Sequence, residues 1–415
     1  MSNDTRPEIR FPGFTEDWEE RKLGDMMDVT SVKRIHQSDW TNSGIRFLRA
    51  RDIVSAAKNE EPSDYLYISE EKYNEYSKNS GKVSQGDLLV TGVGSIGVPL
   101  LITDDNPIYF KDGNIIWFKN EHKIDGNFFY YSFINNKIQK YIRDVAGIGT
   151  VGTYTIDSGK KTPISLPTYD EQIKIGSFFK QLDHTIMLHQ HELDLLKETK
   201  KGFLQKMFPE NGAKVPEIRF PGFTEDWEER KLGELGKTQS GIGFPDAEQG
   251  GSEGTPFFKV SDMNNIGNEY EMRNANHYVS NEQIERKKWK PIKDVPAIIF
   301  AKVGAAIMLN RKRLVTSPFL IDNNTMAYLF NNTWDIYFGK ILFETINLPR
   351  YSQVGALPSY NSSDIENISV KVPVKDEQQK IGTFFKQLDD TIALHQRKLD
   401  LLKETKKSFL QKMFV

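Results

Sequence analysis

The sequence predicts a mixed α/β (α+β) protein in which two diverged domains are each joined to a long, repeated helix. Residues 170–208 and 376–414 align without a gap and differ at 7 of 39 positions. A shorter motif at residues 7–24 returns unchanged at 216–233. The segments between motif and helix share an order of apolar runs and turn signals, but few residues. This pattern predicts a duplicated unit whose helices have a common role and whose domains have different ones.

The long repeated stretch predicts a helix with one apolar seam. Neither copy contains proline, and apolar residues recur at alternating steps of four and three, which is the spacing of a coiled coil. Such a seam needs a partner, and the other copy is the obvious candidate. The seam residues are Phe179, Leu182, Ile186, His189, Leu193 and Leu196 in the first copy, and Phe385, Leu388, Ile392, His395, Leu399 and Leu402 in the second.

Composition narrows the class of protein. A chain of 415 residues is long enough for two or more domains. It has no cysteine, which excludes disulfides and thiolate metal sites and fits a reducing cytoplasm. No apolar run approaches the length of a membrane span. The net charge of −2 gives no sign of nucleic-acid binding, so any such affinity must come from where the basic residues lie.

The repeats predict the domain boundaries. We expect a first domain at 1–169, its helix at 170–208, a linker at 209–215, a second domain at 216–375 and its helix at 376–415. The linker is assigned from its turn residues.

The short motif itself predicts a helix. Thr15 is a plausible N-cap, the helix runs through Trp18 to Leu23, and Gly24 ends it.

With these motifs in place, the whole chain resembles a specificity subunit of a type I restriction-modification system. The resemblance rests on the helix openings DEQIKIGSFFKQLD and DEQQKIGTFFKQLD, the lead-in PEIRFPGFTEDWEERKLG before each domain, and the turn TGVGSIGVPLLI. It implies two target-recognition domains that each read half of a bipartite site in double-stranded DNA. It also implies an antiparallel, pseudo-two-fold helix pair that serves as a spacer.

The resemblance implies partners and excludes chemistry from this chain. By this resemblance, we expect two modification (methyltransferase) subunits to dock on the frame of paired helices and restriction subunits to join them. Adenine methylation and ATP-driven cleavage belong to these partners, and so do S-adenosylmethionine, ATP and Mg²⁺. For this chain we expect no cofactor, no metal ion and no membrane contact.

Two geometric expectations follow. His189 and His395 lie at the middle of their seams, so we expect them to face each other, either as tolerated seam residues or as a pH switch. Half-sites read from one face of DNA should lie roughly one helical turn, about 10 bp, apart. A rigid helix pair would then act as a ruler.

The glycine-rich turn has three possible readings. Gly92-Val93-Gly94-Ser95-Ile96-Gly97 matches a dinucleotide-binding fingerprint, but Pro99 follows and no helix begins there. A hairpin that approaches DNA is the favoured reading, and a structural turn is the other. The candidate DNA contacts at this turn and its counterpart are Thr91, Gly92, Ser95 and Lys302.

Basic and polar residues in the diverged domains are the remaining candidates. Each is either part of a solvated face or a contact to phosphate or base edges. Arg49 and Lys259 occupy corresponding places, and Tyr154 corresponds to the Ser359-Tyr360 pair. These candidates are Lys33, Arg34, Arg49, Tyr154, Lys259, Arg311, Arg313, Ser359 and Tyr360.

No catalytic constellation is found in the sequence. It has no phosphate-binding lysine loop, no adenine-methyltransferase motif and no histidine pair with metal-ligand spacing. We therefore expect a non-catalytic DNA-binding protein. The alternatives are a coiled-coil scaffold whose domains bind proteins or other ligands, and a diverged nuclease.

Overall fold

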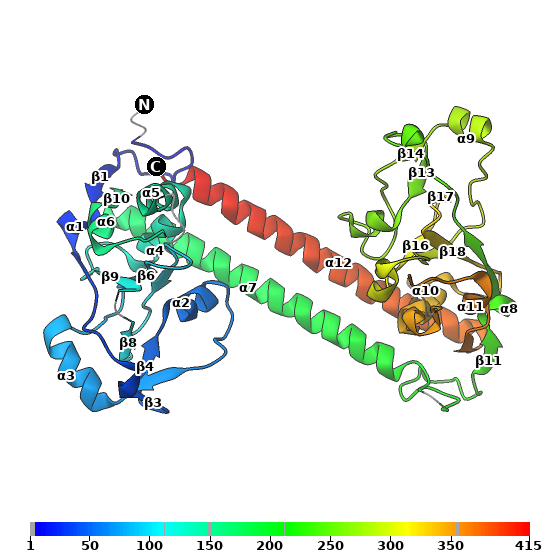
Figure 1. Ribbon diagram of the computed structural model, residues 1–415, viewed down its shortest axis with the longest axis horizontal. Coiled ribbons are helices and arrows are strands. Elements are labelled where there is room, and N and C mark those ends of the chain that lie inside the picture. Colours follow the sequence, from blue (N-terminus) through cyan, green and yellow to red (C-terminus); the bar gives the residue numbers. More distant parts are fainter. Residues whose placement is uncertain (1–4, 112, 148–151, 211, 354–356) are drawn as a thin grey trace. The chain divides into compact units, whose positions relative to one another are not determined.

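The chain divides into two compact units, seen in a computed structural model that describes residues 5–415 except 112, 148–151, 211 and 354–356 (Figure 1). Unit 1 comprises Met1–Gln190 and Lys398–Val415, and unit 2 comprises His191–Arg397. Each unit therefore contains one mixed domain, which we call its head. It also contains the first part of one long helix and the last part of the other.

The head of unit 1 is built on two four-stranded sheets and confirms the mixed α/β class. The first sheet is antiparallel, in the order β2 (Asp28–Thr30), β9 (Ile115–Lys119), β6 (Leu88–Thr91) and β7 (Pro99–Leu101). The second has the order β3 (Trp40–Thr41), β5 (Leu66–Ile68), β4 (Ile45–Leu48) and β8 (Ile108–Phe110), with β4 and β8 parallel.

The head of unit 2 repeats this plan with one strand fewer in its second sheet. Its antiparallel sheet runs β12 (Gly236–Ser240), β18 (Thr325–Phe330), β15 (Ala297–Ala301) and β16 (Lys312–Val315). Its second sheet runs β14 (Tyr278–Val279), β13 (Thr255–Phe258) and β17 (Leu320–Ile321), again with one parallel pair. The sequences LLVT of β6 and AIIFA of β15 are buried along their whole length, as continuous apolar runs predict.

Helices cover these sheets in both heads. In unit 1 they are α2 (Ala50–Ala57), α3 (Glu70–Ser80), α4 (Gly126–Ile134), α5 (Asn136–Ala146) and α6 (Ile156–Lys161). In unit 2 they are α9 (Asn281–Lys287), α10 (Ile336–Thr345) and α11 (Ser362–Glu366), with 3-10 turns η2 (Asp246–Glu248), η3 (Val260–Asn264), η4 (Ala305–Leu309) and η5 (Leu348–Tyr351). The aromatic residues of α4 lie mostly in the core, as their helical spacing predicts.

The predicted helix in the short motif is wrong. Glu19–Lys22 forms strand β1, which pairs antiparallel with β10 (Pro163–Leu166), and only a short turn of helix, α1 (Leu23–Met26), follows. The second copy does the same with β11 (Glu228–Lys231) and β19 (Ser369–Val372), followed by α8 (Leu232–Leu235). Helix propensity is a weak preference, and hydrogen bonding to a distant strand overrides it.

The repeated stretch forms two helices of equal length, α7 (Tyr169–Lys206) and α12 (Lys375–Lys412). Within each unit the two helix segments run antiparallel. In unit 1, Phe178 packs on Phe409 and Asp183 pairs with Lys406. In unit 2, Phe203 packs on Phe384. The predicted seam residues are all buried or half-buried. In the part of the chain that is described, no helix is long and apolar enough to span a membrane.

Candidate nucleic-acid interface

Each head is fastened to the start of its long helix by a buried ion pair that the lead-in motif supplies. In unit 1, Arg10 donates two hydrogen bonds of 2.7 Å to the carboxylate of Glu171, which is fully buried. In unit 2, Arg219 makes the same pair with Glu377 at 2.7 and 2.8 Å. The pKa of each arginine is raised, chiefly by the hydrogen bond to its glutamate.

A second set of contacts joins the long helix to the N-terminus of α4 or α10. The Gln172 side chain accepts from Asp125 N at 3.1 Å, and Gln378 accepts from Asp335 N at 2.9 Å. A glycine follows one turn later in each helix. A Cβ at Gly176 would lie 2.7 Å from a backbone nitrogen of α4, so the two helices can approach this closely only at glycine. We call the ion pair, the glutamine and the glycine together the joint.

The glycine-rich turn of unit 1 connects β6 to β7 as a hairpin. Thr91 is fully buried, and its hydroxyl accepts a 2.9 Å hydrogen bond from Val98 N and donates to Ser95 O. Gly92 is buried and Ser95 is exposed. Because a strand and not a helix follows the glycines, this turn lacks the helix N-terminus that binds a dinucleotide pyrophosphate.

The counterpart in unit 2 begins at Lys302. Its ammonium group donates a 3.0 Å hydrogen bond to Ser240 Oγ, and its backbone carbonyl accepts from Tyr360 N at 3.0 Å. Ser359 is half-buried and pairs with Val303 in an isolated bridge. In unit 1, Tyr154 N donates to Gly92 O at 2.8 Å, so the predicted correspondence between the two tyrosines has a matching backbone contact.

Both of these tyrosines point into the core. Tyr154 and Tyr360 are buried, and burial raises the pKa of each hydroxyl. The Tyr154 hydroxyl is hydrogen-bonded to Thr162. The segment 148–151 just before Tyr154 lies outside the described residues. Because the side chains of Thr91 and the two tyrosines are buried, we leave them out of the interface proposed below.

Arg49 and Lys259 occupy equivalent positions but have different surroundings. The backbone nitrogen of each caps a turn by donating to a buried aspartate, Asp52 at 2.7 Å and Asp262 at 2.9 Å. The Arg49 guanidinium also binds Asp52 and Asp64, and the hydrogen bond to Asp52 is the main reason that its pKa is raised. The Lys259 ammonium reaches only the neutral Gln249, at 3.3 Å, among the side-chain contacts described.

The two predicted arginines of unit 2 differ in role. Arg313 is half-buried and donates to Asn268 O at 2.6 Å and to Lys312 O at 2.9 Å, so it braces the loop after η3. Burial lowers its pKa. Arg311 lies nearer the surface, where it hydrogen-bonds to the Asn264 side chain.

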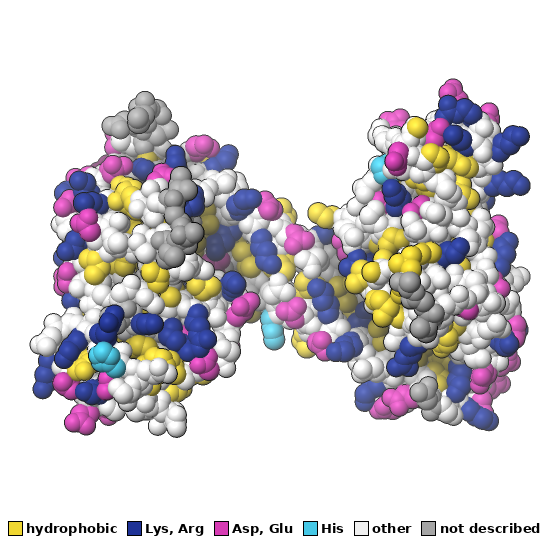
Figure 2. Space-filling model, in the orientation of Figure 1, with side chains coloured by type: hydrophobic (Ala, Val, Ile, Leu, Met, Phe, Trp, Pro, Cys, Tyr) yellow, Lys and Arg dark blue, Asp and Glu magenta, His cyan; other side chains and the backbone are white. Residues whose placement is uncertain are grey.

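In unit 1, Lys33 and Arg34 are exposed, and the Lys33 ammonium lies 4.0 Å from the centre of the Tyr76 ring. A related contact not predicted from the sequence stacks Arg46 on Tyr65 at 3.7 Å. Only the strand pairing of β4 with β5, which sets Arg46 opposite Tyr67, brings these residues together. Figure 2 shows Lys and Arg side chains gathered over this part of unit 1, around α2 and β8.

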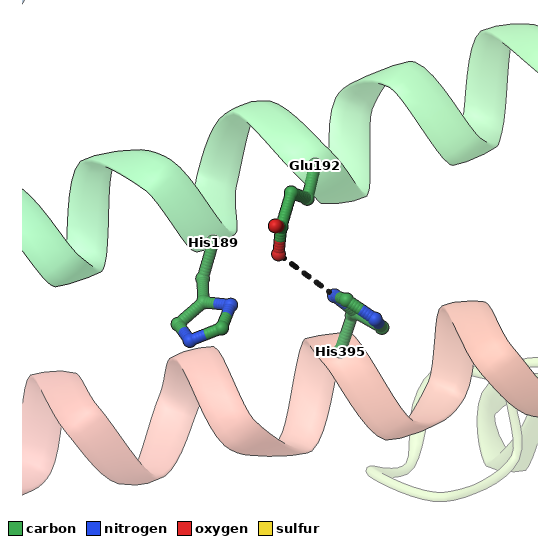
Figure 3. Close-up of side chains that lie close together, drawn as sticks. All are labelled: His189, Glu192 and His395. Atoms are coloured by element: carbon green, nitrogen blue, oxygen red, sulfur yellow. Dashed lines mark ion pairs between the residues drawn. The ribbon is translucent and has the colours of Figure 1, made fainter.

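The seam histidines lie where the helices cross the boundary between the units. His395 of α12 forms a 3.5 Å ion pair with Glu192 of α7, both in unit 2, and Figure 3 shows this pair with His189 one turn earlier on α7. The predictions that the two histidines face each other, and that the chain holds no metal ion, stay predictions.

The architecture defines a class of protein: two mixed α/β domains of one plan, each fastened by the same joint to one of two near-identical long helices. Residues 15–198 and 224–404 match the family described as type I restriction modification DNA specificity domain. The chain therefore belongs to this family, as the sequence motifs predicted.

Individual relatives agree with this assignment. A putative type I restriction enzyme specificity subunit of Haemophilus influenzae is 32% identical over 163 residues, which cover 39% of each chain. The MjaIX specificity subunit of Methanocaldococcus jannaschii is 22% identical over 430 aligned positions, covering 96% of this chain and 92% of the relative. The crystal structure of a type I restriction-modification S subunit from M. genitalium shares the fold, with a TM-score of 0.64, 15% identity and 99% of each chain covered.

The joint is the part of the site that sequence reasoning did not identify. Its signal was present, because the DEQ triplet and the arginine of the lead-in are identical in both copies. Nothing in the sequence, however, indicates that Arg10 meets Glu171, because the two residues are separated by the entire first head.

Proposed function

We propose that this chain is the DNA-reading subunit of a type I restriction-modification complex, and that each head reads one half of a bipartite target in double-stranded DNA. The observation that carries the proposal is the contrast between joint and head. The joint has the same residues and nearly the same distances in both units. The heads share one plan of strands but present different side chains. Two heads with different surfaces, held by the same joint, suit a protein that reads two different DNA sequences.

The chain has no chemistry of its own in this proposal and directs partners in the cytoplasm. Two modification subunits, which are adenine methyltransferases, and the restriction subunits supply catalysis and bind S-adenosylmethionine, ATP and Mg²⁺. Four exposed leucines support docking of two copies of one partner: Leu188 and Leu195 on α7, and Leu394 and Leu401 on α12. They occupy the same two positions, one heptad apart, in both helices.

The DNA contacts that we propose are the predicted residues whose side chains reach the surface. These are Lys33, Arg34 and Ser95, which are exposed in unit 1, and Lys302 and Arg311, which are half-buried in unit 2 but make their side-chain hydrogen bonds at the surface. Cations at such positions neutralise phosphates, and binding then weakens as salt increases.

The decisive experiment maps methyl-adenine at base resolution in cells with and without this gene, with the modification subunit present in both. We expect a gapped, two-part motif that disappears with the gene. If methylation is unchanged, the proposal fails, and the scaffold alternative, in which the heads bind proteins or other ligands, takes its place. In the same cells, four residues inserted into each long helix should lengthen the gap of the motif.

A binding experiment tests the proposed contacts. Lys302→Glu with Arg311→Glu should weaken binding of the chain to DNA and reduce its salt slope by about one per lost phosphate contact. Lys237→Glu is the control, because Lys237 is an exposed lysine of unit 2 whose ammonium already pairs with Asp294. Unaltered binding by the double variant would remove both residues from the interface.

A further inference from the structure

Three apolar loop tips distinguish the head of unit 2. Ile266 is 92% exposed, Met308 and Leu309 are 63% and 58% exposed, and Leu357 is 59% exposed. Among the described residues 5–168, which include the head of unit 1, no large apolar side chain is more than 40% exposed. Figure 2 shows hydrophobic side chains on the surface of unit 2 around β16. Single exposed apolar residues are common, but a group at loop tips indicates a binding surface.

The loop that presents Ile266 is held rigidly by side-chain hydrogen bonds. Asn268 is fully buried, and its amide group donates to Asp262 O and Asn274 O, both at 2.8 Å. Asn274 in turn donates to the carbonyl of Ile266 itself at 3.1 Å. The guanidinium of Arg313 braces Asn268 O from β16. The exposed position of Ile266 is therefore built into the fold, which lowers the cost of ordering this loop when a ligand binds.

The same loop is tied to the other two tips. Arg311, which follows η4, hydrogen-bonds to Asn264, and η4 is the turn that carries Met308 and Leu309. At the other end of η4, Gly304 N donates to Pro358 O at 2.9 Å, next to Leu357. These bonds link the three segments that carry the tips.

The charge around the tips favours a polyanion as the ligand. Residues 295–321 and 345–363, which supply η4 and the Leu357 segment, contain no Asp or Glu. Their basic residues are Lys302, Arg311, Lys312, Arg313 and Arg350. Lys312 and Arg313 are half-buried and donate to backbone carbonyls, which leaves Lys302, Arg311 and Arg350 for a ligand. The Ile266 loop contributes Glu269, whose carboxylate accepts from Gly267 N at 3.0 Å, and Glu271, which pairs with Arg273 at 3.8 Å. An apolar surface made for another protein would not require this excess of positive charge.

We propose that Ile266, together with Met308 and Leu309, forms an apolar wedge that enters a groove of double-stranded DNA and partly unstacks a base step of the half-site read by unit 2. This inference rests on the proposed function. Apolar side chains inserted between base steps unstack them at a cost of a few kcal/mol, which additional protein–DNA contacts offset. Lys302 and Arg311 would neutralise the phosphates that flank the step.

The test uses the full chain, alone and with its modification subunit, and a library of random duplexes from which bound molecules are sequenced. The variant is Ile266→Ser, Met308→Ser and Leu309→Ser combined. Since all three side chains are exposed, thermal unfolding should be unchanged. We expect the variant to bind the selected target about tenfold more weakly, which corresponds to about 1.4 kcal/mol. Sequence preference should be lost in the half-site of unit 2 and kept in the other. Val374→Ser, at an exposed position just before α12, is the matched control.

A second readout tests unstacking itself. A target with 2-aminopurine placed in turn at each step of the second half-site should brighten at one step with the wild-type chain and not with the variant. If the variant binds and selects DNA like the wild type, the wedge is wrong. If it reads DNA normally but no longer assembles with the modification subunit, the tips are a protein-docking surface and the wedge is again wrong. If the wild-type chain selects no two-part motif, the proposed function itself fails.

Discussion

Units 1 and 2 are alike where the heads meet the helices and unlike where the heads meet solvent. The Arg10–Glu171 and Arg219–Glu377 pairs agree in hydrogen-bond distance to within 0.1 Å. By contrast, the guanidinium of Arg49 in unit 1 pairs with two aspartates, Asp52 and Asp64. At the equivalent position in unit 2, the ammonium of Lys259 contacts only the side chain of Gln249 among the contacts described. The same joint therefore supports two heads of different surface chemistry.

The two joints provide the largest expected effect. Arg10→Ala and Arg219→Ala should each lower the free energy of unfolding by about 3–5 kcal/mol, because each leaves a buried glutamate unpaired. Denaturant unfolding of the full chain measures both. Arg6→Ala, which breaks an exposed pair with Asp17, is the control and should change little. Unequal losses in the two variants would show that the joints are not equivalent.

The long helices of the two units also differ in the surroundings of an equivalent aspartate, Asp183 on α7 and Asp389 on α12. In unit 2, Asp389 is buried and binds Lys200 at 2.8 Å as well as Lys340, and Glu344 completes a network of four charges. In unit 1, Asp183 is more exposed and binds Lys406 and the hydroxyl of Tyr131. This hydroxyl has a raised pKa, first because of burial and then because of Asp183.

This difference predicts that neutralising the two aspartates lowers the free energy of unfolding by unequal amounts. Asp389→Asn should lower the free energy of unfolding by about 2–3 kcal/mol, because two buried lysines then share one carboxylate. Asp183→Asn should cost about 1 kcal/mol, because its pair is partly solvated. The same unfolding measurement on both variants compares them, and a larger loss for Asp183→Asn would contradict the prediction.

Removing the cap side chains Arg49 and Lys259 should change the free energy of unfolding by different, smaller amounts. Arg49→Ala should cost about 1–2 kcal/mol, because it leaves the buried Asp52 without its charged partner. Lys259→Ala should cost less than about 0.5 kcal/mol, because its ammonium contacts only a neutral amide. Thermal unfolding of both variants measures the difference, with Arg51→Ala as an exposed control beside Arg49. Equal losses of stability would contradict the prediction, because they would mean that both side chains stabilise their caps to the same extent.

The last comparison concerns pH and unit 2 alone. Burial lowers the pKa of Lys312 from its ordinary value of 10.5 to about 8, and the corresponding strand β7 of unit 1 has no lysine. Between these two pH values the unfolded chain binds more protons at this site than the folded chain, so stability rises with pH across this window. The wild type should therefore gain stability relative to Lys312→Met between pH 8 and about 10.5. A constant difference between the two proteins over this range would contradict this.

The sequence by itself determined the duplication, the two long helices with their seams, the mixed class of the heads and the family. The duplication, the helices and the mixed class follow from periodicity and from internal repetition, which are local or self-comparing signals. The family follows from the resemblance of the repeated motifs to those of known specificity subunits. The sequence also predicted that Tyr154 corresponds to Tyr360 and Arg49 to Lys259, but not the backbone and capping contacts that each pair makes.

Only the tertiary structure decided which side chains are available. The helix predicted from Thr15 became strand β1, because β10 offered backbone hydrogen bonds across the whole head. The side chains of Thr91, Tyr154 and Tyr360 are buried, and the guanidinium of Arg313 donates to backbone carbonyls. Ile266, by contrast, is exposed on a loop that asparagine side chains hold in place. Such outcomes depend on contacts between residues far apart in the chain, and neither composition nor spacing encodes which of two polar residues will face water.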